Sequence, residues 1–183
     1  DARVLRCLDV DGGGLVWERG PEDPKTRPVC TDTGVLVGEN AVISVYDHSN
    51  GMRLASVGVP NEQIRAIAVD NGTAFVLAGS GLSAVSIPDG EERWSRGENQ
   101  ARADGLAVGD NSIVAPVSQE SLGSGPSVAA FDRADGTLRW RYVVDGVFSP
   151  KIVSQPVLAD GAVFAMSNTE TGVTALGDLP PQG

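Results

Sequence analysis

Residues 131–140 read FDRADGTLRW, and three other segments of the chain share this pattern without gaps. They are LDVDGGGLVW at 8–17, YDHSNGMRLA at 46–55 and VSIPDGEERW at 85–94. Each begins with an apolar residue, continues with Asp or Ser, and has glycine at its sixth position. Three of the four end in tryptophan and one ends in Ala55, and the chain contains no other tryptophan. All three tryptophans therefore occupy one repeated position.

Each segment has the pattern of a β-hairpin. The glycines at the sixth position are separated by 38, 39 and 46 residues, and they are Gly13, Gly51, Gly90 and Gly136. In the segment quoted first, an apolar run at 128–131 enters an Asp-Gly turn and a second strand leaves at 137–140. Such a turn needs a positive φ, which glycine adopts without steric cost. The pattern therefore predicts two antiparallel strands in each segment.

Further short strands are predicted between the hairpins. They lie at 28–31 and 35–37, at 66–69 and 74–77, at 105–108 and 112–117, and finally at 155–158, 162–166 and 173–176. Four strands in about 40 residues is typical of a β-propeller blade. We therefore predict an all-β chain, a β-propeller of four-stranded antiparallel blades, occupying residues 1–183 as one domain. Its repeats are expected at about 1–19, 26–58, 64–97, 101–144 and 149–178.

Composition excludes several other classes. The 183 residues include 23 glycines and 11 prolines, are 41% hydrophobic and 5% aromatic, and carry a net charge of −10. This is too turn-rich for a helix bundle and too apolar for a disordered chain. A strongly acidic chain lacks the positive surface that nucleic acid or an anionic membrane requires. No apolar run approaches the roughly 18 residues of a membrane helix, so no membrane insertion is expected.

The repeated segments resemble the tryptophan-docking repeat of PQQ-type β-propellers, which reads Ala-x-Asp-x-x-x-Gly-x-x-x-Trp. Residues 130–140 match it throughout, whereas two repeats depart from it at Ala55 and Ser86. The resemblance implies that each tryptophan lies flat between blades, on the peptide near the next blade's glycine. It assigns this docking role to Trp17, Trp94 and Trp140 with the four repeat glycines. Non-catalytic relatives include an outer-membrane assembly scaffold and sensor domains, so we expect an extracytoplasmic binding or scaffold domain.

The resemblance does not carry catalysis with it. The quinoprotein dehydrogenases that look like this chain use a disulfide between adjacent cysteines, a calcium held by Glu, Asn and Asp, and an Asp base. This chain has only Cys7 and Cys30, which are 23 residues apart. We therefore assign no catalytic, cofactor-binding or metal-ligating residue. PQQ and calcium are expected only under the alternative, a fragment of a quinone-dependent dehydrogenase.

Two further features are open from sequence alone. Cys7 and Cys30 either form a disulfide between neighbouring blades or are two free thiols. The fourth repeat is longer because of residues 119–126, QESLGSGP. This segment is either a tolerated surface insertion or a partner-binding loop. The loop candidates are Gln119, Glu120, Ser121, Leu122, Gly123 and Ser124.

The blade count leaves two architectures. The first segment supplies the last two strands of a blade and the last segment supplies about the first three, so the chain contains about four blades. The family normally uses seven or eight. Either the ends meet in a closed four-bladed ring, or the chain is the C-terminal half of a larger propeller, completed by another chain or by self-association. The chain begins at Asp1 without an initiator Met, so we expect a removed upstream segment, such as a signal or a tether, and a periplasmic, cell-surface or secreted location.

Overall fold

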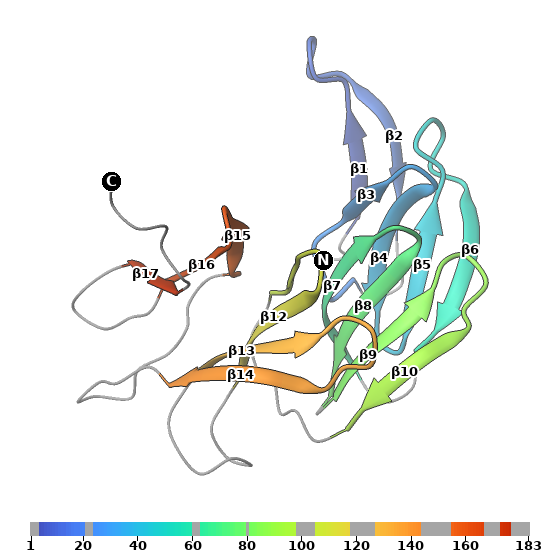
Figure 1. The fold of residues 1–183 in the computed structure, drawn as a ribbon. Coiled ribbons are helices and arrows are strands. Elements are labelled where there is room, and N and C mark those ends of the chain that lie inside the picture. The colour runs from blue at the N-terminus through green and yellow to red at the C-terminus, as the bar shows by residue number, and fades with distance from the viewer. Residues whose placement is uncertain are drawn as a thin grey trace.

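The computed structural model describes residues 4–20, 24–59, 63–79, 81–97, 105–117, 127–143, 155–166 and 173–176. All regular secondary structure within these ranges is β-strand, in five antiparallel sheets set side by side (Figure 1). None of these residues belongs to a helix long and apolar enough to cross a membrane. The predicted all-β fold with antiparallel blades is confirmed.

Three sheets have four strands each, in chain order. The first contains β3 (Val29–Thr31), β4 (Gly34–Glu39), β5 (Val42–Tyr46) and β6 (Arg53–Gly58). The second contains β7 (Ile64–Asp70), β8 (Thr73–Ala78), β9 (Gly81–Ser86) and β10 (Glu92–Arg96). The third contains β11 (Ala107–Val108), β12 (Ser112–Val117), β13 (Ser127–Asp132) and β14 (Leu138–Val143). Two smaller sheets are β1 (Leu5–Leu8) with β2 (Leu15–Arg19), and β15 (Val157–Ala159) with β16 (Ala162–Met166) and β17 (Val173–Leu176).

The four repeated hairpins share one turn geometry. In the second, the Asp47 N–H donates to the Met52 carbonyl at 2.8 Å and the Gly51 N–H donates to the Asp47 carbonyl at 3.0 Å. The same pair of bonds recurs in the other three. The positive φ predicted for the repeat glycines is confirmed, with 67° at Gly13, 67° at Gly51, 78° at Gly90 and 73° at Gly136. Glycine adopts this left-handed conformation readily, so the turn is encoded locally.

The sheets stack face to face like the blades of a propeller. The first strands contact one another in sequence, β3 with β7, β7 with β11 and β11 with β15, so they form a common inner edge. The second strands are covered on both faces, and β4 and β8 are buried along their whole length. Strands covered on both faces need near-continuous apolar sequence, which is what GVLVGE and TAFVLA supply.

Apolar cores fill the spaces between adjacent sheets. Leu36 and Ile43 pack with Val76 between the first and second four-stranded sheets. Phe75 packs with Phe131 between the second and third. Burying one side chain of this size contributes about 1.5–3 kcal/mol, so these interfaces supply much of the stability.

Polar contacts connect the same sheets near their turns. Arg133 forms an ion pair with Asp70, and its guanidinium lies 5.5 Å from the centre of the Phe75 ring. The Gln155 side-chain amide donates to the Leu106 carbonyl at 2.7 Å, linking the β15 side of the chain to β11. The second and third four-stranded sheets are therefore joined by both apolar and polar contacts, and a polar contact joins the segments that precede β11 and β15.

The two ends of the chain do not form one blade. The β1–β2 hairpin projects beside β3–β6, whereas β15–β17 lies next to β11 at the other end of the stack (Figure 1). Among the described strands, no substantial packing joins β1 or β2 to β15–β17. In the described residues, the first and last sheets therefore do not meet to close a four-bladed ring.

Candidate functional site

Trp17 joins the N-terminal hairpin to the next sheet. A Cβ atom on Gly51 would lie 2.6 Å from the Trp17 ring, so the indole rests directly on the glycine backbone. The Trp17 Nε1–H donates to the His48 carbonyl at 2.8 Å, three residues before this glycine. Two residues after Trp17, the Arg19 guanidinium donates to the Asn50 carbonyl at 3.3 Å. Trp17 is only 7% exposed, as expected of a side chain that holds two blades together.

Trp94 repeats this arrangement one joint further along. A Cβ atom on Gly136 would lie 2.6 Å from the Trp94 ring. The Trp94 Nε1–H donates to the Arg133 carbonyl at 3.1 Å, again three residues before the glycine. The Arg96 Nε–H donates to the Asp135 carbonyl at 2.9 Å. One rule therefore describes both joints: a tryptophan contacts the next hairpin's glycine, and the arginine two residues later contacts the same turn.

The joint between the first two four-stranded sheets has a different occupant. Ala55 stands where the other repeats have tryptophan, and a Cβ atom on Gly90 would meet the Val57 side chain at 3.3 Å. Val57, two residues after Ala55, is buried in the core between these sheets. At this joint, the aliphatic side chain of Val57 packs against the glycine turn in place of an indole ring.

The third tryptophan differs from the sequence expectation. Trp140 on β14 is 39% exposed and rests on no glycine among the described residues. Gly13 has the turn conformation of its counterparts, yet nothing lies within 4 Å of a Cβ atom placed there. The sheet that follows β14 comprises β15, β16 and β17 in the described residues, and no described glycine turn of that sheet lies against Trp140.

The acidic residues of the turns have structural roles. The Ser49 hydroxyl donates to Asp47 Oδ1 at 2.5 Å and the Ser49 N–H donates to it at 2.7 Å. These bonds lower the pKa of the Asp47 carboxyl below its usual value. The Thr137 N–H and hydroxyl hold Asp135 in the same way and lower its pKa. Ionised carboxylates are the better acceptors for such turn bonds, so these acids stabilise hairpins.

The two cysteines are free thiols in the structure. Cys7 lies on β1 opposite Trp17, and Cys30 lies on β3 opposite Val35. Cys30 lies on the strand that the sequence predicted at 28–31, and the disulfide that the sequence left open is not formed. The proposed loop, Gln119 to Ser124, lies outside the described residues.

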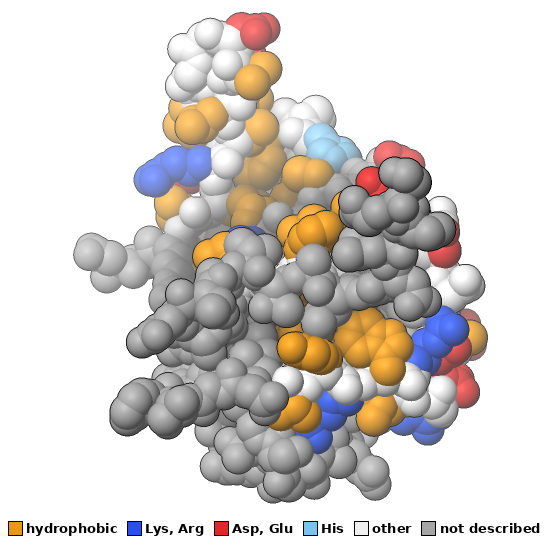
Figure 2. All heavy atoms as spheres, turned by 60° about the vertical axis from the view of Figure 1, so that its left-hand side comes forward, with side chains coloured by type: hydrophobic (Ala, Val, Ile, Leu, Met, Phe, Trp, Pro, Cys, Tyr) orange, Lys and Arg blue, Asp and Glu red, His pale blue; other side chains and the backbone are white. Residues whose placement is uncertain are grey.

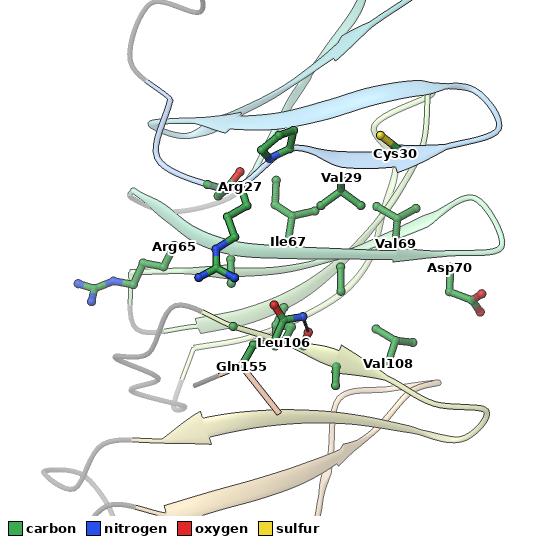
Figure 3. A pocket seen from close by; sticks show the side chains of 16 residues that line it. Arg27, Val29, Cys30, Arg65, Ile67, Val69, Asp70, Leu106, Val108 and Gln155 are labelled. Carbon is green, nitrogen blue, oxygen red and sulfur yellow. Dashed lines mark hydrogen bonds between the residues drawn. The ribbon is translucent and has the colours of Figure 1, made fainter. Parts of the chain in front are cut away.

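A groove follows the inner edge of the sheets. One hollow of about 530 Å³ lies among the first strands β3, β7 and β11, and Gln155 lines its far side. Figure 3 shows Arg27 pointing into the middle of the lining residues, whereas the Arg65 guanidinium points outward, away from them. The floor is apolar, with Val29, Ile67 and other aliphatic side chains.

A second hollow, of about 560 Å³, adjoins the first. Both are lined by residues 26–28 and by Arg65. Arg6 and Lys25 also line the second hollow, and no described acidic residue does. Four of the chain's 14 Lys and Arg residues therefore meet at one place in a protein of net charge −10.

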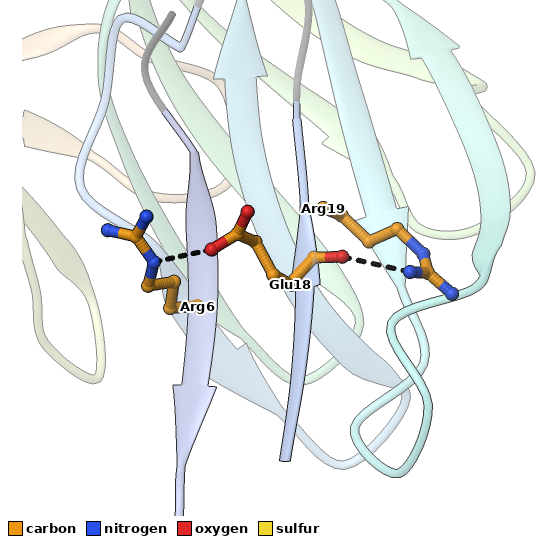
Figure 4. Close-up of polar contacts among 3 residues, drawn as sticks. All are labelled: Arg6, Glu18 and Arg19. Atoms are coloured by element: carbon orange, nitrogen blue, oxygen red, sulfur yellow. Dashed lines mark hydrogen bonds and ion pairs between the residues drawn. The ribbon is translucent and has the colours of Figure 1, made fainter. Parts of the chain in front are cut away.

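Two of these cations are unpaired within the described chain. Arg6 forms an ion pair with Glu18 at 2.6 Å across β1 and β2 (Figure 4). Neither Arg27 nor Arg65 has an ion-pair or hydrogen-bond partner among the described residues, and the Arg65 Nε is buried without an acceptor. A buried donor without a partner is costly, so a ligand with acceptor oxygens would be stabilised here.

Sequence reasoning missed this groove, although a signal was present. Arg27 and Arg65 are 38 residues apart, about one repeat, with Arg27 two residues before β3 and Arg65 the second residue of β7. Recognising equivalent positions in successive repeats would have brought them together. Both positions lie outside the repeated hairpin pattern.

The described residues do not fit the calcium and quinone site of the dehydrogenase alternative. They contain no group of three or more His, Cys, Asp or Glu side chains placed to hold a metal ion. The whole sequence lacks adjacent cysteines. The sole histidine, His48, lies in a hairpin turn, where its carbonyl accepts the Trp17 indole.

Comparison with known proteins gives the family and the fold. The sequence profile of the outer membrane protein assembly factor BamB family matches residues 1–180. No curated protein matches the chain. Among solved structures, BamB from Moraxella catarrhalis matches with a TM-score of 0.69 at 16% identity, over 96% of this chain and 60% of that one.

Two other solved propellers are also similar. The computationally designed Ika8 protein matches with a TM-score of 0.73 at 18% identity, over 94% of this chain and 52% of that chain. A quinohemoprotein alcohol dehydrogenase, ADHIIG from Pseudomonas putida HK5, matches with a TM-score of 0.65 at 16% identity, over 97% of this chain and 39% of that one. The chain thus spans about two fifths to three fifths of these three structures. Identities this low show a shared β-propeller fold.

Proposed function

The chain belongs to the family of the outer membrane protein assembly factor BamB, and from this membership we propose a non-enzymatic binding or scaffold domain outside the cytoplasm. The observation that carries the proposal is the inner groove. It combines an aliphatic floor with Arg27 and Arg65, two cations without a described partner. Binding sites commonly combine an apolar lining with a few polar groups that fix orientation.

The groove favours an extended polypeptide with acidic side chains. Its two hollows adjoin along the first strands, so together they form an elongated surface rather than a closed cavity. Arginine binds carboxylates through two parallel hydrogen bonds, which adds geometric specificity. The rest of the protein is strongly acidic and repels such a ligand, which confines it to the groove. The partner is therefore a protein segment carrying Asp or Glu beside apolar residues.

Fluorescence anisotropy tests this proposal with a labelled ten-residue peptide in which Glu alternates with Val. The wild-type chain is expected to bind it, and Arg27→Glu is expected to weaken binding by about tenfold or more. Arg53→Glu makes the same charge change on the exposed outer strand β6 and is the matched control, expected to change affinity less than about twofold.

A second peptide in which Lys replaces Glu checks the sign of the interaction and is expected not to bind. Equal losses for Arg27→Glu and Arg53→Glu would show that only net charge matters. Equal binding of both peptides would do the same. Either result contradicts a site at the groove.

The alternative is a fragment of a quinone-dependent dehydrogenase, which the similarity to ADHIIG favours at the level of fold. PQQ and calcium would then bind and support dye reduction. We expect no reduction above that of PQQ and calcium without protein, because the described residues offer no metal-holding group. Sustained, protein-dependent reduction with an alcohol or sugar would establish the enzyme.

A further inference from the structure

The strand β7 borders the groove with its edge rather than with one of its faces. Its residues 65–70, six in succession, all line the first hollow. Side chains alternate between the two faces of a strand. Ile67 and Val69 pack in the core toward the first four-stranded sheet, and Ala66 and Ala68 pack in the core toward the third. A hollow lined by every residue of this run therefore lies along the backbone edge of β7.

The β7–β8 hairpin determines which backbone groups point into the groove. Residues 71–72 form its turn with φ values of 46° and 68°, as in a two-residue type I′ turn. Asp70 and Thr73 flank the turn and exchange backbone hydrogen bonds, and bonded pairs alternate with non-bonded pairs along an antiparallel ladder. By this alternation, Ile67 and Val69 direct their N–H and carbonyl groups away from β8 and toward the groove.

These outward backbone groups are unpaired within the described chain. No hydrogen bond joins them to another described residue, and the neighbouring first strands β3 and β11 do not pair with β7. A row of unpaired N–H and C=O groups is a template for an added strand. With seven residues, β7 can pair over several positions, whereas β3 has three residues and β11 has two.

A β-bulge at the start of β7 places a cation at one end of this edge. The pairing with β8 shifts register between Ile64 and Ala66, so Arg65 is the extra residue. Bulges are over-represented next to functional sites, where they re-aim a side chain. The Arg65 Nε is buried without an acceptor, and Arg27 points into the middle of the residues that line the first hollow (Figure 3). A strand added to this edge therefore runs past two cations.

The second hollow extends the groove toward the β1–β2 hairpin. Val4, Leu5 and Arg6 line this hollow at the start of β1. Hydrophobic side chains are visible along the projecting hairpin in Figure 2. A partner that combines acidic and apolar side chains is thus complementary to the groove along its length.

We propose that the partner binds by adding a β-strand to the inner edge of β7, with its backbone paired to Ile67 and Val69. This inference rests on the proposed binding function and specifies the partner: an extended segment with one free strand edge, carrying Asp or Glu beside apolar residues. The segment accepts hydrogen bonds from the two outward N–H groups and donates to the two outward carbonyls, and its carboxylates bind Arg27 and Arg65. A helix, or a strand already paired on both edges, has no free backbone groups to offer.

Backbone N-methylation of the Glu-Val peptide tests strand addition. In an extended strand, the amides of alternate residues point to opposite edges, so the Glu amides lie on one edge and the Val amides on the other. One peptide carries N-methyl groups at two central Glu residues and the other at two central Val residues. The two have the same composition and charge, so each is the matched control for the other.

Fluorescence anisotropy is expected to separate these two peptides. Because only one peptide edge pairs with β7, one of them should bind about tenfold or more weakly than the unmodified peptide, and the other within about threefold of it. Equal affinities of all three peptides, or equal losses for both methylated ones, would overturn strand addition and leave the proposed binding function standing. Failure of the unmodified peptide to bind would overturn both.

Hydrogen exchange resolved for single amides by NMR checks the same pairing on the protein. The Ala68 amide already pairs with β8, whereas the Ile67 and Val69 amides point into the groove. Saturation with the unmodified peptide is expected to slow exchange at Ile67 and Val69 by about tenfold or more, and at Ala68 far less. Unchanged exchange at Ile67 and Val69 in the bound protein would contradict the proposal.

Discussion

Gly136 and Gly161 have nearly the same backbone conformation and quite different surroundings. Their φ values are 73° and 77°. A Cβ on Gly136 would lie 2.6 Å from Trp94, whereas nothing lies within 4 Å of one on Gly161. The pair therefore separates the cost of the turn conformation from the cost of losing the joint.

Gly161→Ala is expected to lower the free energy of unfolding by about 1–2 kcal/mol, the cost of a left-handed alanine. Gly136→Ala is expected to cost at least about 2 kcal/mol more, because Trp94 must move as well. Urea denaturation followed by circular dichroism measures both. Equal costs would mean that the indole does not depend on the glycine.

The tryptophans allow a second comparison. Trp17→Ala removes a buried indole and its hydrogen bond to His48, and should cost about 3–5 kcal/mol. Trp140→Ala should cost less than about 1 kcal/mol because the ring is exposed. Thermal or urea unfolding measures this order, and the reverse order would contradict it.

The turn carboxylates predict an acid sensitivity. The folded-state pKa of Asp47 is lowered by its bonds from Ser49. The Asp47 carboxylate therefore stabilises the folded state at pH values above its unfolded-state pKa of about 4. This stabilisation is lost as the pH falls through its lower folded-state pKa. Asp47→Asn keeps an acceptor in the turn but cannot titrate.

Urea midpoints between pH 6 and pH 2.5 measure the effect. The wild type is expected to lose more stability over this range than Asp47→Asn does. Parallel curves for the two proteins would show that the carboxylate does not contribute.

Among elements, β4 and β5 carry the most informative polar pair. Glu39 on β4 is 6% exposed, and the Tyr46 hydroxyl on β5 donates to it at 2.8 Å. Burial, together with this carboxylate, raises the pKa of Tyr46. The folded state therefore favours the neutral form of Tyr46. The stabilisation from this hydroxyl is present below about pH 10 and is lost as the pH rises through the folded-state pKa of Tyr46.

Tyr46→Phe is expected to cost about 1–3 kcal/mol at pH 7, because it leaves a buried carboxylate without its donor. It should also reduce the loss of stability above pH 10, where the wild-type hydroxyl begins to ionise. Chemical denaturation at pH 7 and pH 11 measures both effects. An unchanged stability at pH 7 would contradict the assigned hydrogen bond.

Whether a feature could be predicted from the sequence depends on how far apart in the chain its interacting residues lie. The hairpins could be predicted because the glycine turn and the alternating strands are encoded within ten residues. The exposure of Trp140 could not, because it depends on what the following sheet places against β14. The groove could not be predicted from hairpin motifs, because Arg27 and Arg65 meet only when β3 lies beside β7.

At the scale of the whole molecule, the described residues form a stack of blades with a basic groove along its inner edge. The composition gives a strongly acidic chain, from which no nucleic-acid binding was predicted. The net charge does not reveal that four of the cations lie close together at the groove.

Hydrogen exchange with and without a saturating Glu-Val peptide tests the binding account most directly. The account predicts slower exchange in 24–30, 64–70 and 105–108, which border the groove, and no change in the outer strands β6, β10 and β14. Protection confined to the outer strands, or no protection at all, would contradict it.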